Sequence, residues 1–238
     1  MKKLRLIILL LGVMKINSSY SQSQEECLNN LSIFAESAKV KNYDAAYDTW
    51  KFVLESCPKI NLAVYTYGER ILKHKIKNSS GEEQENFKKS LVLLYDKWIL
   101  NFPNKKGVSR VGNILSTKAQ VMIDYKMAND AEVYKVFDQA YKKDPESFTN
   151  PKGLYNYFNT LYKQYKSGEN NVTPEHLFNM YEEISEKFEL EATKLAKKLD
   201  KILIKIDNDE PLTNRETKNK RVYEVNSRAI GIFLSNLD

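Results

Sequence analysis

The residues of this sequence that could perform chemistry are few and widely separated. The two histidines, His74 and His176, have no metal-ligating partners at a recognisable spacing, and we expect His74, which lies among lysines, to be solvated. Cys27 and Cys57 form no C-x-x-C motif, and the sequence has no glycine-rich phosphate loop and no nucleophile elbow. The sequence therefore predicts no catalytic, cofactor-binding or metal-binding residue, and a protein that is not an enzyme.

Two polar segments come closest to a ligand-binding pattern. Asp207, Asp209 and Glu210 resemble the start of a calcium loop, but the glycine and the distal glutamate of such a loop are missing. We therefore expect a solvated acidic turn. His176 lies in the first turn of a predicted helix, where it could bind a metal only with partners from distant parts of the chain.

Residues 1–21 have the layout of a cleavable secretory signal. Three basic residues precede an apolar run from Leu6 to Val13, and Ser19-Tyr20-Ser21 provides a small-x-small cleavage site. The apolar run is too short to span a bilayer as a permanent helix. The pattern predicts export, with an uncleaved N-terminal anchor as the alternative.

The formal net charge of +6 depends partly on this signal. Removal of residues 1–21 takes away four basic and no acidic residues, which leaves a formal charge of +2. The remaining lysines and glutamates are interspersed, and no stretch of basic residues alternates with stacking aromatic residues. A nucleic-acid partner is therefore not expected.

The body of the chain is predicted to be helical and repetitive. Glycine and proline are scarce, with 8 and 6 residues, and no alternating strand pattern of useful length occurs. Three prolines, Pro58, Pro103 and Pro145, each close a predicted helix. A large residue lies eight positions before each proline, and an apolar residue lies five positions before it. These residues are Trp50, Tyr95 and Phe137, and Val53, Trp98 and Ala140. Such a period predicts stacked pairs of helices.

The first of these units resembles a tetratricopeptide repeat. Ala46 and Trp50 fall where that family has a small residue and an aromatic residue that fills the groove between two helices, and Pro58 follows. Ile33 falls where the first helix of the family usually has leucine. Phe34 stands where the family prefers a small residue, so the first pair should be spaced differently. The resemblance implies a right-handed α-solenoid of antiparallel helix pairs.

The resemblance covers three recognisable repeats within residues 22–147, and residues 148–238 are expected to continue the solenoid as a more divergent helical part. Tyr67-Gly68 matches the leucine–glycine site of a first helix. Residues 78–85 are expected to replace the usual tight turn before a helix at 87–102. Other helices are expected at 62–76, 111–125, 131–143, 151–165, 173–206 and 222–237, with a mobile polar loop at 207–220.

The two cysteines lie at neighbouring ends of the first predicted hairpin. Cys27 opens its first helix and Cys57 closes its second. In the oxidising compartment that the signal predicts, we expect a disulfide between them. Two unpaired cysteines are the alternative.

In tetratricopeptide arrays the first helices line a concave groove that holds extended peptides or helices. Mapped onto this chain, the resemblance implies a partner-binding groove with contributions from three helix pairs. The candidate residues are Asn30, Glu36 and Ser37 in the first unit, Arg70, His74 and Lys77 in the second, and Tyr155, Asn159 and Lys163 in the fourth pair.

The signal, the early cysteine pair and the divergent repeats together resemble secreted repeat proteins of Gram-negative cell envelopes. The predicted function is a non-enzymatic scaffold without a cofactor, in the periplasm or at the periphery of the outer membrane, that binds another envelope protein or peptide. Two alternatives stay open. One is a structural subunit that self-assembles through the apolar helix at 222–237. The other is a small-ligand binder or enzyme with a pocket between the helix at 173–206 and the repeats.

Overall fold

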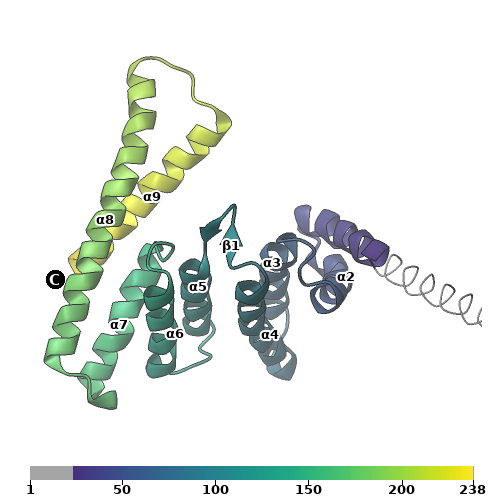
Figure 1. The fold of residues 1–238 in the computed structure, drawn as a ribbon, viewed down its shortest axis with the longest axis horizontal. Helices are drawn as coiled ribbons and strands as arrows, with labels where there is room; N and C mark the ends of the chain where they lie inside the picture. Colours follow the sequence, from purple (N-terminus) through teal and green to yellow (C-terminus); the bar gives the residue numbers. More distant parts are fainter. Residues whose placement is uncertain (1–23, 238) are drawn as a thin grey trace, which may run out of the picture. The chain divides into compact units, whose positions relative to one another are not determined.

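The computed structural model describes residues 24–237 as two mostly helical, compact units that divide between Pro103 and Asn104 (Figure 1). Consecutive helices pack against each other within each unit, so the predicted mainly helical architecture is confirmed. The predicted signal, residues 1–21, lies outside the described residues. None of the helices between residues 24 and 237 is long and apolar enough to cross a membrane.

The first unit is built from four helices over its described residues. These are a helix over residues 24–39, α2 (Tyr43–Ser56), α3 (Ala63–Lys77) and α4 (Gly81–Asn101). Helix α3 packs against both α2 and α4. The predicted disulfide between Cys27 and Cys57 is present and links the first helix to the end of α2, with the two Cα atoms 6.2 Å apart.

Trp50 and Gly68 pack closely against each other between α2 and α3. The buried indole of Trp50 donates a hydrogen bond from Nε1 to the carbonyl oxygen of Val64, at 2.7 Å. A Cβ atom at Gly68 would lie only 2.5 Å from the same Nε1. The absence of a side chain at Gly68 therefore gives the indole its place between the helices. Trp50 fills a groove between helices, as predicted.

Two predictions for the first unit are wrong. Helix α4 begins at Gly81, so only a short turn separates it from α3 instead of the expected segment 78–85. Glu82 and Glu83 lie in the first turn of α4, where negative charge favours a helix N-terminus. Ile33 is 45% exposed, whereas Phe34 is buried and contacts Tyr67 edge-on, so the core position lies one residue later than the resemblance implies.

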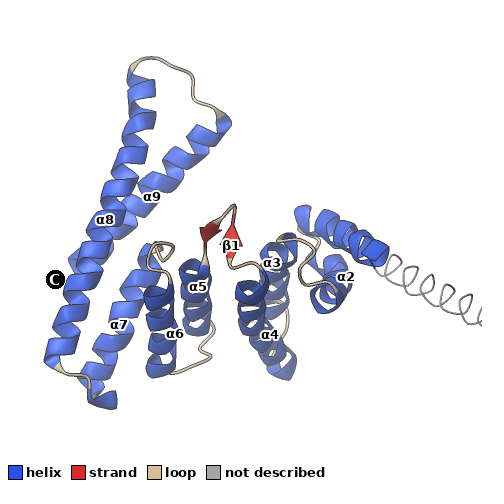
Figure 2. Cartoon of the chain, viewed as in Figure 1, coloured by secondary structure: helices blue, strands red, loops and turns tan. Residues whose placement is uncertain are grey.

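The second unit begins with a short β-hairpin that the sequence did not predict (Figure 2). Its two antiparallel strands, β1 (Asn104–Lys105) and β2 (Val108–Ser109), have two residues each. The turn between the strands contains Lys106 and Gly107, both at positive φ. The helices that follow are α5 (Val111–Asp124), α6 (Asp130–Lys143), α7 (Pro151–Ser167), α8 (Pro174–Asp207) and α9 (Asn214–Leu237), with a short 3₁₀ turn, η1 (Glu169–Asn171), before α8.

A buried carboxylate connects α5 to the end of α6. Asp144 accepts hydrogen bonds from the hydroxyl of Ser109 at 2.7 Å, from the backbone N–H of Gly112 at 3.2 Å, and from both the backbone N–H and the hydroxyl of Ser147. Burial by itself would raise the pKa of Asp144, but these hydrogen bonds together hold it below its ordinary value. A Cβ atom at Gly112 would lie 2.0 Å from the carbonyl oxygen of Asp144, so the contact requires glycine.

An aromatic cluster forms the centre of the second unit. Phe137 of α6 stacks on Phe148, with ring centroids 5.9 Å apart, and both contact Tyr157 of α7. Phe137 is fully buried. In the first unit, Tyr95 is also fully buried and Trp50 is nearly so. The three large residues that precede the helix-ending prolines therefore all occupy core positions.

Helices α8 and α9 form a long hairpin, and α8 continues well past α7 (Figure 1). The predicted loop at 207–220 is mostly wrong, because α9 starts at Asn214. The cause is a capping box: the Thr213 hydroxyl accepts a hydrogen bond from the backbone N–H of Glu216, and the Glu216 carboxylate accepts one from the backbone N–H of Thr213.

Candidate functional site

The predicted groove residues of the first repeat lie on the helix over residues 24–39. Asn30 is half-buried and donates a hydrogen bond to the carbonyl oxygen of Glu26, at 2.9 Å. Glu36 is exposed and forms an ion pair with Lys39, and Ser37 is half-buried. The contacts of Asn30 and Glu36 are therefore local contacts along one helix.

The second set lies on α3. Arg70 and Lys77 are exposed, and the guanidinium of Arg70 lies 5.6 Å from the ring centroid of Tyr67. We expected His74 to be solvated, but it has two specific contacts. Its Nε2 lies 3.0 Å from the carboxylate of Asp44, and its ring contacts Tyr43.

Asp44 also connects His74 to a lysine. Its second carboxylate oxygen lies 2.7 Å from Nζ of Lys75. The hydrogen bonds from Lys75 and His74 hold the pKa of Asp44 below its ordinary value. This polar cluster ties α2 to α3, and the sequence missed it because Asp44 precedes His74 by thirty positions.

The third set lies on α7, in the second unit. Tyr155 and Asn159 are half-buried, and Lys163 is exposed with its ammonium 3.3 Å from the carboxylate of Asp130 on α6. The nine candidate residues thus fall in two units, with six in the first and three in the second. A single groove that joins them stays a prediction.

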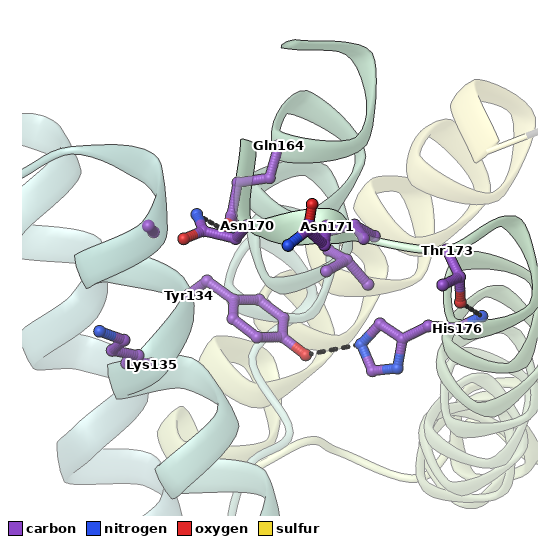
Figure 3. Close-up of a pocket in the computed structure, with 10 residues that line it drawn as sticks. Tyr134, Lys135, Gln164, Asn170, Asn171, Thr173 and His176 are labelled. Carbon is purple, nitrogen blue, oxygen red and sulfur yellow. Dashed lines mark hydrogen bonds between the residues drawn. The ribbon is translucent and has the colours of Figure 1, made fainter. Parts of the chain in front are cut away.

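A pocket of about 360 Å³ lies in the second unit, between α6, α7 and the start of α8 (Figure 3). It combines an apolar part with side-chain amides, a phenol, an imidazole and an ammonium group. The lining residues are Ala131, Tyr134, Lys135, Leu161, Gln164, Asn170, Asn171, Val172, Thr173 and His176.

Local signals in the sequence fix the two helices that supply Tyr134 and His176. Asn129 and Glu132 form a capping box that starts α6. Thr173 caps α8 by accepting a hydrogen bond from the backbone N–H of His176, at 3.1 Å. The two caps fix the starts of these helices, with His176 in the first turn of α8 and Tyr134 in the second turn of α6.

The rim between α7 and α8 has an unusual backbone. Gly168, Asn170 and Asn171 all have positive φ, at 72°, 57° and 49°. Asparagine tolerates this left-handed conformation better than most residues, and such conformations are concentrated at functional sites. The backbone here turns sharply and brings both asparagines to the pocket.

The floor of the pocket contains a buried amide. Gln164 is only 3% exposed, and its Nε2 donates a hydrogen bond to the carbonyl oxygen of Thr160, at 3.0 Å. Its Oε1 accepts a hydrogen bond from Nδ2 of Asn170, at 2.8 Å. Because both ends of Gln164 are fixed, the amide of Asn170 is also held in one orientation at the rim.

Tyr134 and His176 contact each other in the lining of the pocket, with the phenol oxygen 3.2 Å from Nε2 (Figure 3). The ring of Tyr134 stacks on Tyr157, with centroids 5.4 Å apart. Burial, together with the nearby carboxylates of Asp138 and Glu183, raises the pKa of Tyr134 to about 12. The phenol therefore stays protonated at neutral pH and serves as a hydrogen-bond donor, not as a base.

The charge of the lining is one-sided. Lys135 is cationic, and none of the ten lining residues carries a carboxylate. The amide and hydroxyl groups of the rim both donate and accept hydrogen bonds. The arrangement suits a ligand with an anionic group and with further hydrogen-bonding atoms.

The sequence pointed only partly to this pocket. The small-ligand alternative expected a pocket between the helix at 173–206 and the repeats. This pocket is lined in part by the start of that helix, and the alternative itself stays a prediction. His176 was noted without a partner. Tyr134 and Gln164 were missed because they follow the ordinary periodic pattern of packed helices. The usable signal was Asn170-Asn171 after Gly168, a sequence that favours left-handed backbone.

Comparisons with models of known protein families, with curated proteins and with solved structures find no match. The tetratricopeptide resemblance therefore stays a prediction from the residues of this chain.

Proposed function

We propose that this chain is an exported, non-enzymatic scaffold of tetratricopeptide-like helix pairs that binds an extended segment of an envelope protein. The pocket of the second unit is the anchor for that segment, and an acidic side chain of the partner enters it. The observation that supports this proposal most strongly is the combination of a half-open polar rim with a cationic lining free of carboxylates.

The pocket has the groups that an extended peptide needs. The amides of Asn170 and Asn171 and the hydroxyl of Thr173 can satisfy the N–H and C=O groups of a peptide backbone. Lys135 can pair with a carboxylate, and a ring nitrogen of His176 can form a hydrogen bond with it. Ala131 provides apolar surface for the stem of the entering side chain.

Binding fits the pocket better than catalysis does. A general base should have a pKa near the working pH, whereas the pKa of Tyr134 is raised to about 12 by burial first and by Asp138 and Glu183 next. The phenol is therefore suited to donate a hydrogen bond to a bound group and to keep the imidazole of His176 in place.

Export is supported by the disulfide between Cys27 and Cys57, because such bonds persist mainly in oxidising compartments. The N-terminal signal pattern supports the same conclusion. A location in the periplasm or at the periphery of the outer membrane is part of this proposal.

Selection from a displayed library of random seven-residue peptides tests the proposal. Peptides rich in aspartate or glutamate should be enriched on the parent protein, because the ammonium group of Lys135 attracts a carboxylate. Lys135→Glu should abolish this enrichment. Lys143→Glu, which reverses an exposed charge at the end of the same helix, should leave it intact. Equal enrichment on both variants, or none on the parent, would contradict the proposal.

A small-molecule binder is the second candidate, and the pocket volume supports it. About 360 Å³ lies in the range of ordinary ligand pockets, 300–1,000 Å³. Native mass spectrometry of protein purified from the cells that make it should then reveal a bound compound. Ala131→Phe, which fills the pocket, should release that compound. A parent spectrum without any adduct would count against this candidate.

A further inference from the structure

A second pocket lies in the first unit, between α2 and α4, and we call it the α2–α4 pocket. Both helices pack against α3, and Leu72 of α3 also lines the pocket. Its volume is about 210 Å³. Because all of its lining residues belong to the first unit, the proposed function, which uses the pocket of the second unit, leaves it unexplained.

The deep part of the α2–α4 pocket is apolar. Trp50, Leu72 and Leu94 line it and are only 2%, 1% and 1% exposed. Nearer the surface, Leu54 of α2 is half-buried, and Leu93 of α4 is 59% exposed. An apolar group that covered these two leucines would remove apolar surface from water and would therefore bind favourably.

Two aromatic rings bound the pocket toward the starts of α2 and α4. The ring of Tyr47 on α2 meets Phe87 on α4 edge-on, with centroids 5.6 Å apart. Tyr47 also contacts the ring of Trp50 at 5.9 Å, and the ammonium group of Lys75 lies 5.1 Å from its centroid. Tyr47 is thus held by neighbours from three helices, so this wall is already formed without a ligand.

The surface edge of the pocket is polar and carries more positive than negative charge. Its exposed lining residues are Lys51 and Glu55 on α2, and Ser90 and Lys97 on α4. Glu55 follows Lys51 by four positions, and this order along a helix is the less favourable one for an ion pair. The two ammonium groups therefore outweigh the single carboxylate.

The lysines at this edge are available to a ligand. Within residues 24–237, neither Lys51 nor Lys97 forms an ion pair. Other lysines of the same unit do pair with carboxylates, namely Lys39, Lys73, Lys75 and Lys88. An anionic group at the edge of the pocket would give Lys51 and Lys97 the partner that these other lysines already have.

We propose that the α2–α4 pocket binds a small carboxylic acid with an apolar tail. The tail covers Leu54 and Leu93, and the carboxylate pairs with the ammonium groups of Lys51 and Lys97. An apolar cavity of about 150 Å³ holds one benzene ring, so about 210 Å³ has room for a ring or a short chain. This inference goes beyond the proposed function, because it concerns a different pocket in the other unit.

The surroundings of the two leucines favour a small acid over an amphipathic helix. A helix that binds in a groove uses a row of apolar anchors three or four positions apart. Here charged or hydroxyl side chains flank Leu54 and Leu93 on both helices, so the apolar surface is a spot and not a row. The excess of ammonium groups favours an acid over an amine of the same size.

Octanoate, octanol and octylamine share one tail and differ in the head group, so their binding to the full mature chain tests the proposal. Octanoate with a terminal bromine atom should quench tryptophan fluorescence, because bromine quenches an indole that it touches and Trp50 lines the pocket. Quenching should persist in Trp98→Phe, which leaves Trp50 as the only tryptophan. In competition, octanoate should bind about tenfold or more tighter than octylamine, with octanol between them.

Two matched leucine variants locate the tail. Leu93→Asp places a carboxylate in the wall of the pocket and should weaken octanoate binding by about tenfold or more. Leu100→Asp introduces the same charge on the same helix, at a residue that is 77% exposed and lies outside the lining, and should leave binding unchanged. Circular dichroism should show intact helices in both variants, because both leucines are exposed.

A charge reversal locates the carboxylate. Lys51→Glu together with Lys97→Glu should turn the preference from octanoate to octylamine. Lys59→Glu together with Lys77→Glu changes the net charge equally at exposed residues outside the pocket and should keep the preference for octanoate.

Three results would overturn the proposal. They are an absence of quenching by the brominated octanoate, equal affinity for the three head groups, and equal binding to Leu93→Asp and Leu100→Asp. None of them affects the selection of acidic peptides, because that experiment depends on Lys135 in the second unit. Failure of the one proposal is therefore distinguishable from failure of the other.

Discussion

Asp144, at the end of α6, accepts a hydrogen bond from the backbone N–H of Gly112 at the start of α5, at 3.2 Å. Hydroxyl groups of Ser109 and Ser147 complete the shell of donors around the carboxylate. One buried charge thus holds together the β-hairpin, the N-terminus of α5 and the chain that leads to α7.

We expect Asp144→Asn to lower the free energy of unfolding of the second unit by about 1–3 kcal/mol at pH 7, because an amide cannot accept all of these hydrogen bonds. The lowered pKa of Asp144 means that its contribution is complete above its unfolded pKa, about 3.9, and is lost as the pH falls through the folded pKa. Urea titrations at pH 7 and pH 3 should show the gap between parent and variant shrink in acid. The exposed Asp200→Asn serves as the control and should change stability by less than about 0.5 kcal/mol at either pH. A stability difference between parent and Asp144→Asn of the same size at both pH values would contradict a lowered pKa for Asp144.

The contact between Trp50 and Gly68 predicts a strong energetic coupling. Trp50→Ala should cost roughly 3–5 kcal/mol, because it removes a buried indole and leaves a cavity. Gly68→Ala should cost about 1–3 kcal/mol, because its Cβ would lie 2.5 Å from the indole. In the double variant the new methyl group has room, so most of the Gly68→Ala cost should disappear.

Urea denaturation of the four proteins measures this coupling. Gly231→Ala is the control, since its added Cβ would meet nothing within 4 Å beyond its chain neighbours and its own helix backbone, and alanine at this exposed helix position should raise stability by about 1 kcal/mol. Strict additivity of Trp50→Ala and Gly68→Ala would show that the two residues do not share a site.

The disulfide between Cys27 and Cys57 should stabilise the first unit by roughly 3–4 kcal/mol in the chain-entropy account, since it closes a loop of about thirty residues. The double variant Cys27→Ser, Cys57→Ser should lower the midpoint of thermal unfolding, followed by circular dichroism. The exported parent, treated with an alkylating agent without reductant, should gain no mass. Two added alkyl groups would disprove the bond.

Tyr157 donates a hydrogen bond from its buried phenol to the carboxylate of Asp138, at 2.9 Å. Tyr157→Phe should cost about 1–3 kcal/mol, because the partly buried carboxylate loses a donor. Tyr162→Phe is the control and should change stability by less than about 0.5 kcal/mol, since Tyr162 is 40% exposed. Equal losses in the two variants, measured by urea denaturation, would argue against a special role for this bond.

Much of the fold followed from local features of the sequence. Pro151 and Thr173-Pro174 mark helix starts that the structure reproduces, because proline fits the first turn and threonine caps it. The start of α9 was misplaced because the capping box of Thr213 and Glu216 was read as part of a polar loop. Charged composition alone did not distinguish a loop from an exposed helix.

The candidate site was harder to predict than the helices. Tyr134, Gln164 and His176 come from three elements, and each is unremarkable beside its sequence neighbours. Their meeting depends on how α6, α7 and α8 pack, and on the left-handed turn at Asn170 and Asn171. The periodic pattern of apolar residues along one helix carries no information about which side chains of three different elements come together.

The two tryptophans of the chain, Trp50 and Trp98, both belong to the first unit. Intrinsic fluorescence excited at the long-wavelength edge of tryptophan absorption will therefore report on that unit alone, because the tyrosine and phenylalanine rings of the second unit hardly absorb there. The unfolding of the first unit can thus be followed in the intact protein without any attached dye and without a contribution from the second unit.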